Sequence, residues 1–168
     1  TYITLSVRGR RKNRQFQKGL SNLSRTGKQT LQLACEETPR LHHNFVGTEH
    51  VLLGLTRLET GTVANVMKRL GLNRDLIQRE LEQFVGGFPA QQPIVNIPYT
   101  PRVRKAILLA TKEAKILNHD RISGEDIFLG LLLEGDGVAA RVLNKLSVKI
   151  DETRAAILKE SASHGHQT

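Results

Sequence analysis

The amino-acid sequence contains two copies of one pattern, because residues 24–85 align without a gap on residues 100–161 at an offset of 76. Apolar, glycine and acidic positions all recur at this offset. The Leu-Gly-Leu step at residues 53–55 returns at residues 129–131, and His43 and Glu49 return as His119 and Glu125. Internal repetition of this length indicates one supersecondary unit present twice. We therefore expect the two copies to share a core and to place equivalent side chains at equivalent surface positions.

Each copy carries the apolar spacing of four helices. Val63, Val66, Met67 and Leu70 fall at i, i+3, i+4 and i+7, which is the stripe of an amphipathic helix. The predicted helices of the first copy are 26–37, 48–58, 63–70 and 74–85, and those of the second are 101–117, 124–133, 139–146 and 151–160. The predicted fold class is all-α: two tandem four-helix repeats packed with pseudo-twofold symmetry, about eight helices in total.

Composition divides the chain into five segments. Residues 86–99 hold two glycines and three prolines, which break helices and favour extended backbone, so this segment is predicted to be the linker between the repeats. The predicted organisation is a basic N-terminal extension at 1–22, repeat 1 at 23–85, the linker at 86–99, repeat 2 at 100–160 and a polar tail at 161–168.

The net charge of +9 is concentrated at the N-terminus. Residues 1–22 carry no acid and six cations, which are Arg8, Arg10, Arg11, Lys12, Arg14 and Lys18. A basic arm can bind nucleic acid, an anionic lipid surface or an acidic protein. Without interleaved aromatic residues or an RNA-binding signature, nucleic acid is not the partner we favour. The simpler interpretation is a solvated extension, a linker or a remnant of a targeting sequence.

Several functional classes have no support in the sequence. Cys35, the one cysteine, lies in an apolar stretch and is interpreted as a reduced core residue. The only match to a P-loop, Gly27-Lys28, has asparagine and glutamine where glycine and Ser/Thr are required. Zinc-hydrolase, nucleophile-elbow and Cys-x-x-Cys motifs are missing, and no apolar run reaches the length of a membrane span. We expect no catalytic activity in this chain, no cofactor, no metal site and no membrane span.

Three segments resemble a known family. Residues 44–55 (NFVGTEHVLLGL), residues 134–143 (EGDGVAARVL) and residues 97–101 (IPYTP) are similar to the repeat signature of the Clp N-terminal domain, in the form found in ClpC-type AAA+ unfoldases of bacteria and plastids. The resemblance runs from about residue 24 to residue 160. It implies a docking module that sits on an unfoldase ring and delivers substrates for ATP-driven unfolding and degradation by the ClpP peptidase.

The resemblance also implies four site residues. ClpC-type domains that bind arginine phosphate place a threonine and a glutamate at motif positions that correspond here to Ser24 with Glu49 and to Thr100 with Glu125. A carboxylate can hold a guanidinium through charge-assisted hydrogen bonds, and a hydroxyl beside the N–H groups of a helix start can hold a phosphate. Ser24 departs from the family's threonine, so the second pair fits the pattern better. All four residues also suit helix starts without any ligand.

Three functions remain open from the sequence. The first is the adaptor- and substrate-binding N-terminal domain of a ClpC-like unfoldase, with arginine-phosphorylated proteins as one class of substrate. The second is a free-standing accessory or decoy protein of the Clp system without its own ATPase, which the N-terminal extension favours. The third is a nucleic-acid-associated helical protein that uses the basic arm. Expected partners are Clp unfoldase and protease components, adaptors and marked substrates, in a bacterial cytoplasm or a plastid stroma.

Overall fold

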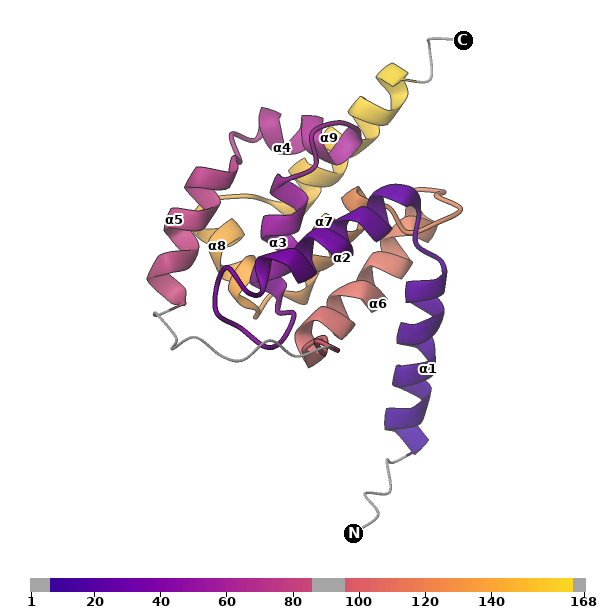
Figure 1. Cartoon of the computed structure of the whole chain (residues 1–168). Helices are drawn as coiled ribbons and strands as arrows, with labels where there is room; N and C mark the ends of the chain where they lie inside the picture. Colours follow the sequence, from indigo (N-terminus) through magenta and orange to yellow (C-terminus); the bar gives the residue numbers. More distant parts are fainter. Residues whose placement is uncertain (1–6, 86–95, 165–168) are drawn as a thin grey trace.

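The computed structural model describes residues 7–85 and 96–164, and these ranges contain nine α-helices (Figure 1). In chain order they are α1 (Val7–Ser21), α2 (Arg25–Glu37), α3 (Thr48–Thr56), α4 (Thr62–Arg69), α5 (Arg74–Phe84), α6 (Pro101–Ile116), α7 (Gly124–Glu134), α8 (Val138–Lys145) and α9 (Ile150–His164). The all-α class and the eight repeat helices predicted from the sequence are confirmed. Helix α1 is additional.

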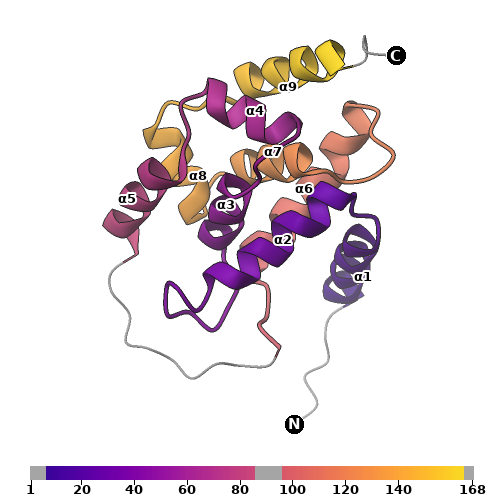
Figure 2. The ribbon, with the colours of Figure 1, turned by 45° about the horizontal axis from the view of Figure 1, so that its top comes forward.

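The two repeats have the same helical order. Helices α2, α3, α4 and α5 begin 76 residues before α6, α7, α8 and α9, respectively. Within each repeat the first two helices pack closely together, and between repeats α4 contacts α9 while α5 contacts α8 (Figure 2). Helix α3 also contacts α7 and α8 of the other repeat. Most buried apolar side chains form one core that includes Leu52, Leu53, Ile127 and Phe128, and a smaller cluster of Val66, Leu117, Leu129 and Ile157 packs where α4 meets α9.

The glycine of each Leu-Gly-Leu step lets two helices approach at backbone distance. A Cβ at Gly54 would lie 2.7 Å from the backbone oxygen of Thr30, and a Cβ at Gly130 would lie 2.3 Å from that of Ala106. From the sequence alone, such a glycine could open a groove for an adaptor helix or permit close helix packing, and packing is the more common role. The structure confirms the packing role.

Helix α1 is docked on the second repeat. Phe16 is 2% exposed, and its ring packs edge-on against Tyr99 at a centroid distance of 5.8 Å. Gly19 lies against Ile107 and Thr111 of α6. The interpretation of residues 1–22 as a solvated extension is therefore wrong for the described part of this segment, because one buried aromatic side chain and a glycine fix the helix on α6.

Two other expectations meet the limits of the described ranges. Most of the predicted linker, residues 86–95, lies outside the described residues, and Ile97, in its described part, packs against the core. Among the described helices, none has the length and apolar character needed to cross a membrane.

Candidate functional site

The segments before the main helices pair crosswise between the repeats. The backbone N–H of Ser24, which precedes α2, donates to the carbonyl of Ile122 at 2.8 Å. The equivalent N–H of Thr100, which precedes α6, donates to the carbonyl of Val46 at 3.0 Å. These contacts belong to two short parallel bridges, Leu23 with Ile122 and Val46 with Tyr99. Each repeat therefore begins its first helix beside the loop that leads into the second helix of the other repeat.

This crosswise pairing changes which predicted site residues meet. Thr100 and Glu49, from different repeats, line one cavity. Ser24 lies against the loop that leads to Glu125. The within-repeat pairs, Ser24 with Glu49 and Thr100 with Glu125, are not formed.

Helix length explains why the within-repeat pairs are separated. Glu49 lies beside His43, whose backbone is bonded to Thr38 at the end of α2, whereas Ser24 caps the start of that helix. Helix α2 has 13 residues, so at about 1.5 Å per residue its ends lie about 20 Å apart. Helix α6, with 16 residues, separates Thr100 from the start of α7 in the same way.

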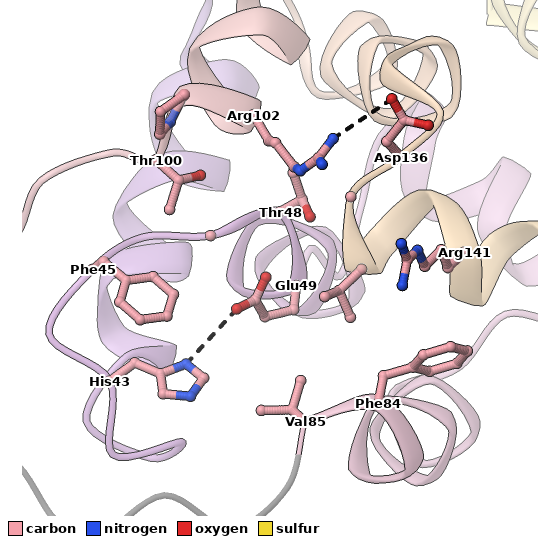
Figure 3. Close-up of a pocket in the computed structure, with 14 residues that line it drawn as sticks. His43, Phe45, Thr48, Glu49, Phe84, Val85, Thr100, Arg102, Asp136 and Arg141 are labelled. Carbon is pink, nitrogen blue, oxygen red and sulfur yellow. Dashed lines mark ion pairs between the residues drawn. The ribbon is translucent and has the colours of Figure 1, made fainter.

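The cavity at Glu49 has a volume of about 650 Å³ and is the candidate site (Figure 3). Repeat 1 supplies one wall from the start of α3 and the end of α5, and repeat 2 supplies the other from the starts of α6 and α8. Its lining residues are His43, Phe45, Gly47, Thr48, Glu49, Phe84, Val85, Thr100, Pro101, Arg102, Asp136, Gly137, Val138 and Arg141. This size suits a ligand of amino-acid or short-peptide dimensions.

Glu49 supplies a buried negative charge. It is 6% exposed, and burial raises the pKa of its carboxyl group above the usual value, against the opposing effect of its own backbone N–H. Its nearest basic nitrogens are Nδ1 of His43 and Nδ1 of His50, each 3.7 Å from Oε1. Within the described ranges, no lysine or arginine forms an ion pair with Glu49. The carboxylate is thus buried without a strong cation.

The two histidines beside Glu49 are held neutral. The backbone N–H of Gly47 donates to Nδ1 of His50 at 2.8 Å, so this nitrogen carries no proton and Nε2 does. Nε2 of His50 then donates to Nδ1 of His43 at 2.9 Å. Burial, reinforced by His43, lowers the pKa of His50 to about 3, and burial also lowers the pKa of His43. Neither ring neutralises Glu49 near pH 7.

His43, Glu49 and His50 also lie close enough to hold a metal ion, with ligand atoms within 4.8 Å of one another. The hydrogen bonds argue against that use. With Nδ1 of His50 accepting from a backbone N–H, the proton sits on Nε2, where an ion would need a lone pair. Metal binding there would require breaking the bond at the start of α3 or forming an imidazolate.

The opposite wall of the cavity is rich in hydrogen-bond donors. Arg102 and Arg141 both line it, and Arg102 is half exposed while bound to Glu134 at 2.9 Å and Asp136 at 3.7 Å. Thr100 accepts from the backbone N–H of Val103, which leaves its hydroxyl hydrogen available to donate. Helices α3, α6 and α8 all begin at this cavity, and the N-terminus of a helix favours an anion. At α8 that role is already filled in part, because Gly137 donates to the Glu134 carboxylate at 2.6 Å and Ala139 donates to Thr48 at 3.3 Å.

The equivalent position around Glu125 is built differently. Thr26, which stands where repeat 2 has Arg102, accepts from the backbone N–H of Gly124 at the start of α7 at 3.1 Å. Its hydroxyl also lies 3.1 Å from that of Ser24. Burial raises the pKa of Glu125. The hydroxyl of Thr26 therefore accepts the N–H of Gly124 within the protein. The guanidinium of Arg102, at the equivalent position of the first site, cannot accept an N–H.

Capping explains the other sequence signals at these helix starts. Ser24 and Thr100 are the N-caps of α2 and α6, and Ser123 forms a capping box with Asp126 at the start of α7. Arg102 and Arg141 were missed by sequence reasoning. The available signal was the mismatch between the copies, since the offset pairs these two arginines with Thr26 and Asn65.

Fold and site together define a class: an all-helical double repeat with a ligand-sized cavity at the junction of its repeats. The Clp repeat (R) N-terminal domain model matches residues 22–146, which is most of the chain. The chain belongs to this family.

Individual relatives agree with that assignment. The chain is 46% identical over 129 residues to the negative regulator of genetic competence ClpC/MecB of Bacillus subtilis, covering 77% of this chain and 16% of that protein. It is 44% identical over 137 residues to the chaperone protein ClpB of Oceanobacillus iheyensis, covering 82% of this chain and 17% of ClpB. A solved structure, the complex of the ClpV N-domain with a VipB peptide, contains a chain of the same fold. The two chains superpose with a TM-score of 0.65 at 18% sequence identity, covering 86% of this chain and 92% of the other. The chain spans about one sixth of the length of the two sequence relatives.

Proposed function

We propose that this chain is a non-catalytic receptor module that binds adaptors or marked substrates for a Clp unfoldase. The single observation that carries the proposal is the buried carboxylate of Glu49, which faces a cavity with two arginines and the starts of three helices. Family membership and the similarity to ClpC and ClpB relatives support the link to an unfoldase. The ClpV N-domain, which shares the fold, is described in complex with a peptide.

The charges of the cavity suit a ligand with a cationic end and an anionic end. A guanidinium at Glu49 would supply the cation that this buried carboxylate lacks, through two charge-assisted hydrogen bonds. A phosphate at the opposite wall would meet Arg102, Arg141 and the Thr100 hydroxyl. Arginine phosphate carries both groups within one side chain. We propose phosphoarginine as the mark that this cavity reads.

The cavity at Glu49 and Thr100 is the proposed site, and the position at Glu125 is not. At Glu125 the hydroxyl of Thr26 already satisfies the start of α7, and no arginine stands in its place. The compartment we propose is a bacterial cytoplasm or a plastid stroma, and the two bacterial relatives support the former.

Calorimetric titration of arginine phosphate tests this assignment. Glu49→Gln keeps the shape of the side chain and removes its charge, so affinity should fall about 10- to 100-fold, the value of a charged hydrogen bond. Glu125→Gln is the matched control and should change affinity less than about twofold, because Glu125 is not among the residues that line the cavity. Plain arginine and plain phosphate should each bind more weakly than the joined ligand.

The crosswise geometry gives a second test on the same titration. Thr100→Val combined with Glu49→Gln should show a coupling of at least about 0.5 kcal/mol, since both residues would hold one ligand. Ser24→Ala combined with Glu49→Gln should be additive. Binding lost in Glu125→Gln and retained in Glu49→Gln would overturn the assignment, as would no binding by the folded wild-type chain.

A further inference from the structure

A second cleft lies between α1 and α6, and Pro101 is the one lining residue that it shares with the Glu49 cavity. Its volume is about 530 Å³, and its lining residues are Gly9, Lys12, Asn13, Pro101, Arg104, Lys105 and Leu108. Three of these residues are cations and none of them is acidic. Leu108 and Pro101 add aliphatic surface. The cleft therefore combines a positive field with an apolar wall.

Two of the three cations of this cleft, Arg104 and Lys105, are held in place by contacts within the protein. The guanidinium of Arg104 lies 4.9 Å from the centre of the Phe16 ring and donates to the side chain of Asn13 at 2.9 Å. Lys105 donates to the backbone carbonyl of Glu134 at 3.2 Å. Because these side chains are already ordered, an anion bound between them would cost little additional conformational entropy.

Helix α1 is what creates the cleft. Lys12 and Asn13 come from α1, whereas Arg104, Lys105 and Leu108 come from the exposed side of α6. Phe16, one helical turn after Lys12, anchors α1 on this side. The family model begins at residue 22, after the end of α1. The cleft is thus a feature of this chain that family membership does not explain.

We propose that the α1–α6 cleft binds a short acidic peptide segment of a protein partner. Glutamate or aspartate side chains of such a segment would pair with Lys12, Arg104 and Lys105, and an intervening aliphatic side chain would rest on Leu108. A nucleic acid fits less well, because none of the lining residues is aromatic and bases would have no ring on which to stack. This site is separate from the phosphoarginine assignment and does not depend on it.

Fluorescence anisotropy with a labelled peptide of alternating glutamate and leucine tests the proposal. The matched variants are Lys12→Glu in the cleft and Lys18→Glu elsewhere on α1, since both side chains are exposed and both substitutions change the net charge equally. We expect Lys12→Glu to weaken binding about tenfold and Lys18→Glu less than about twofold, because screening confines the effect to nearby charges. Glu49→Gln should leave peptide binding unchanged.

Three results would overturn the proposal. If Lys12→Glu and Lys18→Glu weakened peptide binding equally, binding would depend on the overall charge of α1 and not on the cleft. If a control peptide with glutamine in place of glutamate bound equally well, the cleft would not recognise the acidic groups. Tighter binding of a single-stranded oligothymidylate than of the acidic peptide, lost in Lys12→Glu, would assign the cleft to nucleic acid instead.

Discussion

The contact between α6 and α7 gives a sharp prediction for Gly130→Ala. The added Cβ would lie 2.3 Å from the carbonyl oxygen of Ala106 and 3.0 Å from the backbone nitrogen of Ala110. Both atoms belong to the backbone of α6 and cannot rotate away as a side chain would. Since ordinary contacts begin near 3.4 Å, the two helices must separate by about 1 Å at this point.

The magnitude follows from two opposing effects. Forcing extra volume into a packed core costs about 1–3 kcal/mol, and in this contact with rigid backbone we expect the upper end. Replacing a helical glycine by alanine stabilises the helix by at most about 1 kcal/mol, because alanine has the higher helix propensity. The net loss is about 2 kcal/mol, and at about 2–4 °C for each kcal/mol in a domain of this size the Tm should fall by about 4–8 °C.

Gly19→Ala is the matched control, because it is the same substitution in a helix. Its Cβ would meet only side-chain atoms, Cγ2 of Ile107 at 3.2 Å and Oγ1 of Thr111 at 3.4 Å. These side-chain atoms can shift by a few tenths of an ångström, and alanine also favours the helix by up to about 1 kcal/mol, so we expect a change in stability of less than about 1 kcal/mol. Thermal unfolding followed by far-UV circular dichroism measures both variants. A Tm for Gly130→Ala at or above that of the wild type would refute the packing argument.

Further predictions concern charge and anchoring. Burial raises the pKa of Glu49 in the folded protein above the ordinary pKa of 4.5. The Glu49 carboxyl group therefore contributes fully to the stability of the fold only below pH 4.5, where it is protonated, and this contribution is lost as the pH rises through the folded pKa. Glu49→Gln should therefore raise the Tm at pH 7, and the difference should vanish below pH 4.5, as measured by thermal unfolding across pH. Burial alone would raise the pKa of Glu37, but Arg74 and two other arginines lower it. Arg74→Gln should thus destabilise by about 1–3 kcal/mol near pH 7, and by less once pH falls through the lowered pKa of Glu37, which urea titrations at the two pH values check. Phe16→Ala should remove most of the burial that fixes α1, so hydrogen exchange should accelerate in α1 far more than in α7.

The sequence predicted the helices well because local signals and the repeat agreed. The stripe at residues 63–70 became α4, and the helix predicted to open with Pro101 begins at that residue. The Leu-Gly-Leu steps were informative for a physical reason, since glycine in an apolar helix face has few roles other than close approach. Where periodicity, caps and repetition coincided, the boundaries fell within a few residues of the observed ones.

Helix α1 was missed because its pattern is narrow and its charge is dominant. Phe16, Gly19 and Leu20 carry the apolar part of its packing face, whereas Arg10, Arg11, Lys12, Arg14 and Lys18 are exposed. The segment also has no counterpart in the second copy. The net charge of such a helix reflects its exposed side and does not predict whether its other side is buried. Here the buried ring of Phe16 anchors the helix on the second repeat.

The sequence could not predict that Glu49 and Thr100 share one cavity, because this depends on how the two repeats pair. A constant spacing of 25 residues suggests that Ser24 and Glu49 act together, and so do Thr100 and Glu125. Spacing along the chain cannot show which repeat completes which site. That is decided by the bridges at Leu23 and Val46, which are pairings between repeats.

Crosswise construction also explains how one fold can hold two unequal sites. Each position takes one wall from each repeat, so a substitution in one copy alters one site and leaves the other intact. Arg102 contributes a cation at the Glu49 cavity, whereas its counterpart Thr26 contributes an acceptor that closes the start of α7. The backbone of the two repeats stays equivalent, because neither side chain supports the core. Under the proposed function, the repeat supplies a symmetric scaffold, and two mismatched pairs, Thr26 with Arg102 and Asn65 with Arg141, decide which of its two junctions receives a ligand.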